Sequence, residues 1–220
     1  MQAFIERVKN SKQTKPPSRT KGVARRAGGC MTRKRIIVGI SGASGSRLGI
    51  AVLETLRGLT DWETHLVMTR GAELTLGFET DKTPDEVKSM ADVVHPIDGL
   101  AASISSGTFK TEGMIVAPCS MKTAAGIANG YSENLLLRAA DVVIKEHRLL
   151  LLMPRESPLS PIHLKNLLTL SELGTLILPP VPAFYQNPAD MDEAVKLIAG
   201  RALGYFGIET SWIRPWDGRS

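Results

Sequence analysis

Two short segments combine small and hydroxyl-bearing residues in a pattern that suits an anionic ligand. G-A-S-G covers residues 42–45, and P-C-S-M-K-T covers residues 118–123. Each segment follows an apolar run and precedes a helical pattern, where backbone N–H groups attract negative charge. Glycine lets the backbone approach a phosphate, and Ser44, Ser120 and Thr123 add hydroxyl groups. The two segments predict a cradle for a phosphorylated ligand, although a tight turn without a ligand would also explain G-A-S-G.

Charged side chains follow another apolar run and also mark one predicted helix. Arg155 and Glu156 come directly after the apolar residues 149–153. Arg138 and Lys145 lie seven residues apart, which places them on one helix face. Arginine binds phosphate through two parallel hydrogen bonds, and a neighbouring glutamate can transfer a proton. These side chains predict either a phosphate site with an acid–base group, or a surface ion pair beside a solvated helix face.

Residue spacing argues against several other ligand sites. Neither G-x-G-x-x-G nor a P-loop motif is present. Thr69-Arg70 offers no acid for a ribose diol, which disfavours NAD and leaves NADP open. Cys119 has no histidine near it in sequence, so it is either a nucleophile or a buried strand residue. Two cysteines exclude a disulfide framework, and four histidines without ligand spacing suggest no metal site.

Five apolar runs are typical of parallel strands that are buried on both faces, and helical patterns alternate with them. The alternation predicts a single-domain α/β fold, with a Rossmann-like, open, mostly parallel sheet and helices on both faces. Ligands bind such sheets at the carboxyl ends of the strands, where Arg155 and the loop residue Tyr185 would join the two hydroxyl-bearing segments. Residues 93–109 are expected to form a loop. The expected strands cover residues 35–40, 64–69, 113–117, 149–153 and 175–178, and the expected helices cover 46–59, 71–77, 83–90, 120–130, 132–147, 160–173 and 190–206.

The basic charge of the chain is concentrated at its N-terminus. The 220 residues carry a formal net charge of +5, with 27 Lys and Arg against 22 Asp and Glu. Residues 1–30 hold eight basic residues and one acidic residue, which leaves −2 on residues 31–220. We expect a basic, disordered extension over 1–30 and a folded domain over 31–220 that carries no nucleic-acid face. The extension is an upstream stretch before a start at Met31, a transit peptide, or an arm for anionic surfaces.

The composition also bears on the compartment. Hydrophobic residues make up 43% of the chain, which suffices for a packed core. No run of about 18 apolar residues is present, so no membrane-spanning helix is expected. The low cysteine count and the lack of a secretory signal favour a reducing, cytoplasmic compartment.

Five segments, in this order along the chain, resemble the UbiX-type flavin prenyltransferase family. The similarity extends over about residues 34–218 and is greatest to the branch that accompanies UbiD-type decarboxylases of phenolic acids. The fourth segment is long and specific. The segments are G-A-S-G at 42–45, P-C-S-M-K-T at 118–123, R-A-A-D-V-V-I-K-E at 138–146, P-R-E-S-P-L-S-P-I-H-L-K-N at 154–166 and P-A-F-Y at 182–185.

The resemblance implies a metal-independent prenyl transfer. Members of the family join a dimethylallyl group from dimethylallyl phosphate to reduced FMN, at flavin N5 and C6. The product, prenylated FMN, is the cofactor of UbiD-type decarboxylases. Members are homo-oligomers, typically dodecamers. The residues do not distinguish a monophosphate donor from a diphosphate donor.

The resemblance also assigns roles to residues of this chain. Some of the phosphate-binding side chains would come from a neighbouring subunit, and Trp216 would lie near the site. Ser44, Glu79 and Glu156 would assist proton transfer and allylic C–O cleavage. FMN would contact Gly42, Ala43, Ser44, Thr69, Ser120, Met121, Lys122, Thr123 and Arg155, and the prenyl phosphate would contact Arg138, Lys145, Arg155, Tyr185 and Arg201.

Two departures from the family pattern and three alternative functions stay open at this point. Thr69 replaces a commoner serine, and Leu100 stands near the place where some members carry an aromatic residue facing the prenyl chain. The chain could be a non-catalytic carrier of FMN or prenylated FMN. It could also be a flavin-dependent cysteine decarboxylase of the same fold, although no histidine falls in the matching turns. A third alternative is that it decarboxylates phenolic acids itself.

Overall fold

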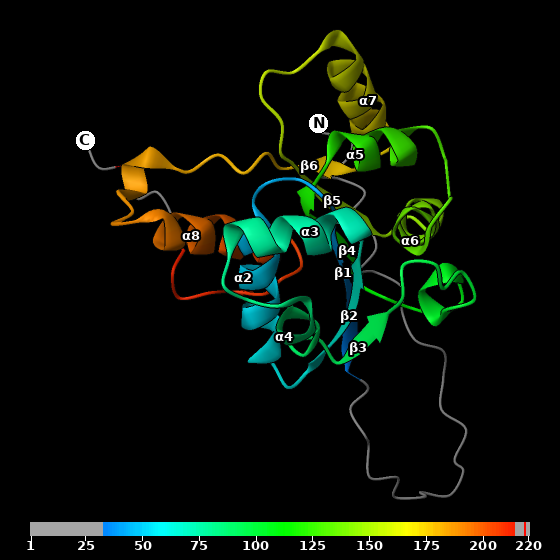
Figure 1. Cartoon of the computed structure of the whole chain (residues 1–220), viewed down its shortest axis with the longest axis horizontal. Helices are drawn as coiled ribbons and strands as arrows, with labels where there is room; N and C mark the ends of the chain where they lie inside the picture. Colours follow the sequence, from blue (N-terminus) through cyan, green and yellow to red (C-terminus); the bar gives the residue numbers. More distant parts are fainter. Residues whose placement is uncertain (1–32, 214–217, 219–220) are drawn as a thin grey trace, which may run out of the picture. The chain divides into compact units, whose positions relative to one another are not determined.

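The computed structural model describes residues 33–213 and residue 218 (Figure 1). The expectations for residues 1–30, Met31 and Trp216 lie outside the described residues. Within the described part, no helix is both long and apolar enough to cross a membrane.

A six-stranded parallel sheet forms the centre of the fold, in the order β3-β2-β1-β4-β5-β6. The predicted Rossmann-like sheet is confirmed. The strand order reverses between β1 and β4, and this place is the switch point of the sheet. The carboxyl ends of β1 and β4 are therefore the expected ligand site. The strands are β1 (Lys34–Ile40), β2 (Trp62–Met68), β3 (Val93–His95), β4 (Gly113–Cys119), β5 (Leu149–Pro154) and β6 (Leu176–Ile177).

Most helices begin at a side chain that accepts a hydrogen bond from the first turn. Thr83 and Ser160 each form a capping box, followed by proline at the first helical position. Thr69, Ser120 and Asp190 also act as N-caps. The helices are α2 (Ser46–Arg57), α3 (Arg70–Glu79), α4 (Pro84–Lys88), α5 (Met121–Ala128), α6 (Leu135–Lys145), α7 (Pro161–Glu172) and α8 (Met191–Gly204), with short 3-10 turns at Ser103–Ser105 and Phe184–Gln186.

Two predictions of local structure were wrong. Residues 93–109 are not all loop, because β3 pairs with β2 and a 3-10 turn follows. The helix expected from residue 132 begins at Leu135, because Asn134 rather than Ser132 accepts the hydrogen bond from Leu137 N. The strand β3 was missed because three residues are too few to produce a periodic pattern. The start of α6 was misplaced because Ser132 and Asn134 are both suitable N-caps and lie two positions apart.

Alternate residues of the central strands enter two separate cores. Ile36 and Val38 of β1 pack in the core on the side of α2 and α8, whereas Ile37 packs in the core on the side of α5 and α6. Figure 1 shows α2 and α8 on one side of the sheet and α6 on the other. Apolar residues on both faces explain the continuous apolar runs in the sequence. The two cores fix the sheet, and the sheet fixes the loops at its carboxyl edge.

A hydrogen-bonded histidine pair lies at the β2–β3 edge of the sheet. His65 Nδ1 is 2.9 Å from His95 Nε2, and His65 Nε2 is 2.8 Å from Glu63 Oε1. Glu63 also accepts a hydrogen bond from Arg35, and Asp92 contributes a nearby negative charge. Partial burial, together with the charge of His65, holds the pKa of His95 below its ordinary value of 6.5.

We expect this pair to make the fold less stable in mild acid. Between the ordinary and the lowered pKa of His95, the unfolded chain binds more protons than the folded chain, so the free energy of unfolding falls as the pH falls. Urea unfolding at several pH values, from about pH 7 to about pH 5.5, would measure this slope. His95→Gln should flatten it, and His147→Asn, at an exposed histidine, should not. A slope unchanged by His95→Gln would contradict the prediction.

Candidate functional site at the carboxyl edge of the sheet

A cavity of about 720 Å³ opens where the sheet order reverses. Arg70 and Asp98 line this cavity and form an ion pair across an N–O distance of 3.0 Å. The structure brings together five of the predicted flavin contacts here, whereas Ala43, Ser44, Met121 and Arg155 do not line the cavity. The five are Gly42, Thr69, Ser120, Lys122 and Thr123.

The loop after β1 packs closely against the start of α3. A Cβ atom on Gly42 would lie 2.8 Å from the carbonyl carbon of Gly71, so only glycine fits at position 42. Gly45 has a φ of 108°, a left-handed conformation that glycine adopts readily. The G-A-S-G segment is therefore a tight turn, and its backbone can also come close to a ligand in the cavity.

The N-terminus of α2 is capped by the carboxylate of Glu79. The two oxygens of Glu79 accept hydrogen bonds from Gly45 N at 2.9 and 3.0 Å, and one also accepts from Ser46 N at 2.7 Å. Partial burial raises the pKa of Glu79, but hydrogen bonds from Ser44, Ser46 and Gly45 outweigh it and hold the pKa below its usual range. Glu79 is therefore ionised and occupies an anion site that a helix N-terminus would otherwise offer to a ligand.

The loop after β4 is organised by the hydroxyl of Ser120. Ser120 Oγ accepts a hydrogen bond from Thr123 N at 3.2 Å and donates one to Thr123 Oγ1 at 3.0 Å. Thr69 Oγ1 accepts likewise from Ala72 N at 3.1 Å. The first turns of α3 and α5 thus face the same cavity, with Lys122 on its wall. These features suit a phosphorylated ligand.

Cys119 is buried in the core on the α5 side of the sheet. Burial raises the pKa of its thiol to about 12. The thiolate is the reactive form of cysteine, and a thiol with so high a pKa stays protonated at neutral pH. Of the two interpretations of Cys119, the nucleophile is therefore wrong and the buried strand residue is confirmed.

We expect Cys119 to resist alkylation in the folded protein. A Cys30→Ser variant leaves Cys119 as the remaining cysteine of the chain. Iodoacetamide at neutral pH should leave this variant unmodified, and denaturation should release one reactive thiol. Mass spectrometry would measure both states, and rapid modification of the native variant would contradict the prediction.

The side chains predicted to bind prenyl phosphate lie in separate places within one chain. Tyr185 and Arg201 line one cavity of about 240 Å³, between α8 and the loop after β6. Arg138 forms an ion pair with Asp141, and Lys145 forms one with Glu146. None of these four predicted side chains lines the cavity of about 720 Å³. One subunit therefore does not gather the predicted phosphate ligands.

Arg155 and Glu156 follow β5 and are exposed. Arg155 N donates a hydrogen bond to Cys119 O at 3.1 Å, which ties the end of β5 to the end of β4. Glu156 accepts a hydrogen bond from Ser157 N at 3.0 Å. Leu100 is also exposed. These three side chains face outward from the subunit, where another chain or a ligand could cover them.

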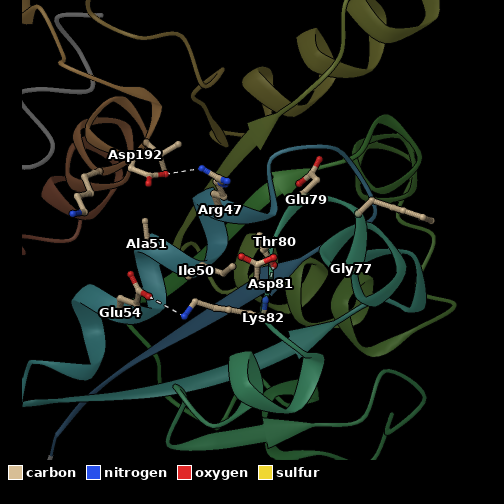
Figure 2. Close-up of a pocket in the computed structure, with 13 residues that line it drawn as sticks. Arg47, Ile50, Ala51, Glu54, Gly77, Glu79, Thr80, Asp81, Lys82 and Asp192 are labelled. Carbon is tan, nitrogen blue, oxygen red and sulfur yellow. Dashed lines mark hydrogen bonds and ion pairs between the residues drawn. The ribbon is translucent and has the colours of Figure 1, made fainter.

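A second cavity, of about 610 Å³, lies between α2, the end of α3 and the start of α8. Figure 2 shows Glu79 at one side of it and an ion pair between Arg47 and Asp192 on another, with an N–O distance of 2.7 Å. Glu54 and Lys82 face each other at 3.9 Å. Sequence analysis missed this charged cavity, because its residues are far apart along the chain and form no motif.

Comparison with known proteins relates this site to a family. The family model described as Flavoprotein matches residues 24–202. The chain is 51% identical over 185 residues to the flavin prenyltransferase UbiX of Neisseria meningitidis serogroup B, which covers 84% of this chain and 97% of that protein. The chain belongs to the UbiX flavin prenyltransferase family.

Solved structures of UbiX-like proteins agree with this assignment. A dodecameric FMN-dependent UbiX-like decarboxylase from Escherichia coli O157:H7 superimposes with a TM-score of 0.82 at 50% identity, covering 84% of this chain and all of that one. The UbiX protein AnUbiX, in complex with FMN and dimethylallyl pyrophosphate, gives a TM-score of 0.83 at 47% identity, covering 86% of this chain and all of that one. The resemblance found in the sequence is thereby confirmed at the level of the UbiX family.

Proposed function

We propose that this enzyme transfers a dimethylallyl group from dimethylallyl phosphate to reduced FMN, at N5 and C6, and supplies prenylated FMN to a UbiD-type decarboxylase. One observation carries the proposal. In a chain about half identical to flavin prenyltransferases, five predicted flavin contacts line one cavity at the switch point of the sheet. The complex of AnUbiX with FMN and dimethylallyl pyrophosphate supports both ligand classes.

The cavity suits FMN on three counts. Its volume of about 720 Å³ is within the range of small-molecule sites. Gly42 packs too closely against the backbone of Gly71 for a Cβ atom, so position 42 contributes only backbone to the wall. The starts of α3 and α5 present backbone N–H groups with Lys122 beside them, which suits the flavin phosphate.

The reaction needs stabilisation of two charges that develop together. When phosphate leaves an allylic carbon, positive charge grows on the prenyl group and negative charge grows on the phosphate. The positive charges of Arg138, Lys145 and Arg201 would stabilise the phosphate, and the hydroxyl of Tyr185 would donate a hydrogen bond to it. Reduced FMN supplies the electron-rich ring that accepts the prenyl group. Orienting both reactants in one closed site lowers the barrier further.

The acidic residues would divide the proton chemistry. Glu79 is ionised and holds the Ser44 hydroxyl, so it can accept a proton through Ser44 or directly. Glu156 follows Arg155 at the end of β5, where it can act at the leaving phosphate. Ser44, whose hydroxyl is hydrogen-bonded to Glu79, would relay the proton in this scheme.

We further propose that the enzyme works as a homo-oligomer, in the form of a dodecamer. The helix α7 carries five apolar residues after Pro161, yet Leu170 is the one that is buried. Ile162 is 71% exposed and Leu168 is 60% exposed. Several exposed apolar side chains on one helix indicate a protein interface, and the E. coli relative is dodecameric. Assembly would also bring Arg138 and Lys145 of one subunit to Tyr185 and Arg201 of another.

An anaerobic reaction tests the function directly. Purified protein is mixed with reduced FMN and dimethylallyl phosphate, and the mass of the extracted flavin is measured. A gain of one C5H8 unit supports the proposal. Unchanged FMN, with the monophosphate and with the diphosphate, would overturn it and leave a flavin carrier. The need for reduced flavin fits the reducing, cytoplasmic location that we propose.

A further inference from the structure

Ser41 links the loop after β1 to the loop after β4, at the point where the strand order of the sheet reverses. The last paired residues of β1 and β4 are Gly39 and Val116. Beyond them, the chain after β1 leads into α2, and the chain after β4 leads into α5. These helices pack in opposite cores, on opposite faces of the sheet. The two loops that line the flavin cavity thus begin side by side and then diverge.

The side chain of Ser41 bridges this gap with two hydrogen bonds. Ser41 Oγ donates to Pro118 O at 3.0 Å and accepts from Ser120 N at 2.7 Å. Ser41 N also donates to Pro118 O at 3.2 Å. Ser41 is 1% exposed, so water does not replace these bonds when the hydroxyl is lost.

The bridge continues into the residues that face the cavity. Ser120, which Ser41 holds by its N–H group, in turn holds Thr123 through its own hydroxyl. Gly42, the next residue after Ser41, is fixed against Gly71 by close backbone contact. Ser41 therefore connects the G-A-S-G segment to residues 120–123, the two segments that contribute to the walls of the cavity.

We infer that Ser41 is a positioning residue for flavin, holding the two walls of the FMN cavity in register without touching the ligand. The inference rests on the proposed function, because it assigns FMN to this cavity. Loss of the hydroxyl leaves Ser120 N–H without its partner and lets the two loops move apart. Flavin affinity should fall, whereas the prenyl phosphate ligands stand on other elements.

Three variants of the full-length protein, in its native assembly, test the inference. Ser41→Ala removes the hydroxyl and should raise the Kd for FMN by about tenfold, with KM for the prenyl donor unchanged. Ser41→Thr keeps a hydroxyl and should restore affinity. Thr111→Val is the matched control, because Thr111 Oγ1 is buried without a hydrogen-bond partner and precedes the opposite end of β4.

Quenching of flavin fluorescence measures the Kd, and amide hydrogen exchange of residues 118–124 reports the bridge without any ligand. Faster exchange and weaker FMN binding in Ser41→Ala, both reversed in Ser41→Thr, support the inference. Equal FMN affinity in Ser41→Ala and wild type would overturn it, as would an equal loss in Thr111→Val. Absence of FMN binding by the wild type would instead overturn the proposed function. Unchanged hydrogen exchange in Ser41→Ala would show that Ser41 does not hold the two loops together, which overturns the inference and leaves the proposed function standing.

Discussion

Replacing Leu168 with glutamate is expected to dissociate the enzyme into monomers and to abolish prenyl transfer. Leu168 is 60% exposed on α7, and burying a leucine side chain in an interface contributes about 1.5–3 kcal/mol per copy. A carboxylate at each copy of the interface removes this contribution and adds the cost of burying a charge. Analytical ultracentrifugation would measure the mass, and the flavin mass assay would measure transfer.

The control for this prediction lies on the same helix. Lys165 is also exposed, and Lys165→Glu introduces the same side chain without removing apolar surface. We expect it to keep the assembly and the activity. The core of the subunit uses Leu170 rather than Leu168, so Leu168→Glu should keep its cooperative thermal unfolding. An active Leu168→Glu monomer would contradict a site shared between subunits.

Mixed assemblies sharpen the same prediction. Arg138→Ala and Arg201→Ala should each be inactive, because each removes a proposed ligand of the prenyl phosphate. If these residues reach one site from different subunits, coexpression of both variants should restore part of the activity, since some sites in a mixed assembly keep both arginines. No recovery in assemblies proven to be mixed would place Arg138 and Arg201 in the site from one and the same chain.

Glu79→Gln is expected to lower the rate of prenyl transfer by about 100-fold, as for loss of a proton-transfer group. The amide keeps the shape of the side chain but has one acceptor oxygen, and it turns an N–H group toward Gly45 N and Ser46 N. The variant should also lose about 1 kcal/mol in its free energy of unfolding, because the N-cap of α2 is weakened. Single-turnover assays and urea unfolding would measure the two effects.

The neighbouring Glu54 provides the matched control. Glu54 lines the same cavity of about 610 Å³ and pairs with Lys82 at 3.9 Å (Figure 2). Glu54→Gln should therefore leave the transfer rate unchanged. If Glu79→Gln lost stability but kept the wild-type rate, Glu79 would be a helix cap and no more. Equal rate losses in both variants would point to the charge of the cavity rather than to Glu79.

Local sequence determined the elements that depend on neighbouring residues. The apolar runs became strands because both faces of β1, β4 and β5 are buried, so polar alternation is absent. Thr83-Pro84 and Ser160-Pro161 started helices where expected, because a cap and a proline act within one turn. The prediction of a cap at Ser132 was wrong, because Asn134, two positions later, can also cap the helix and does so.

The motifs of the sequence determined the family, and the fold placed several motif residues together. Gly42, Ser120 and Thr123 come from different loops and line one cavity, as the rule for parallel sheets predicts. The family resemblance also implied a role for Glu79, but it gave no information on the geometry of this residue. Its contact with Gly45 joins residues 34 positions apart, and no local pattern encodes such a distance.

Only the tertiary structure decided which residues that are far apart in sequence contact each other. The Ser41 bridge to Ser120, the His65–His95 pair and the separate positions of the proposed phosphate ligands all depend on how strands and helices pack. The hydrogen bonds and the burial that set the pKa of Glu79 and Cys119 arise from that packing. Sequence specifies side-chain chemistry and local conformation, whereas the energy of a buried hydrogen bond or charge depends on partners that only the folded chain supplies.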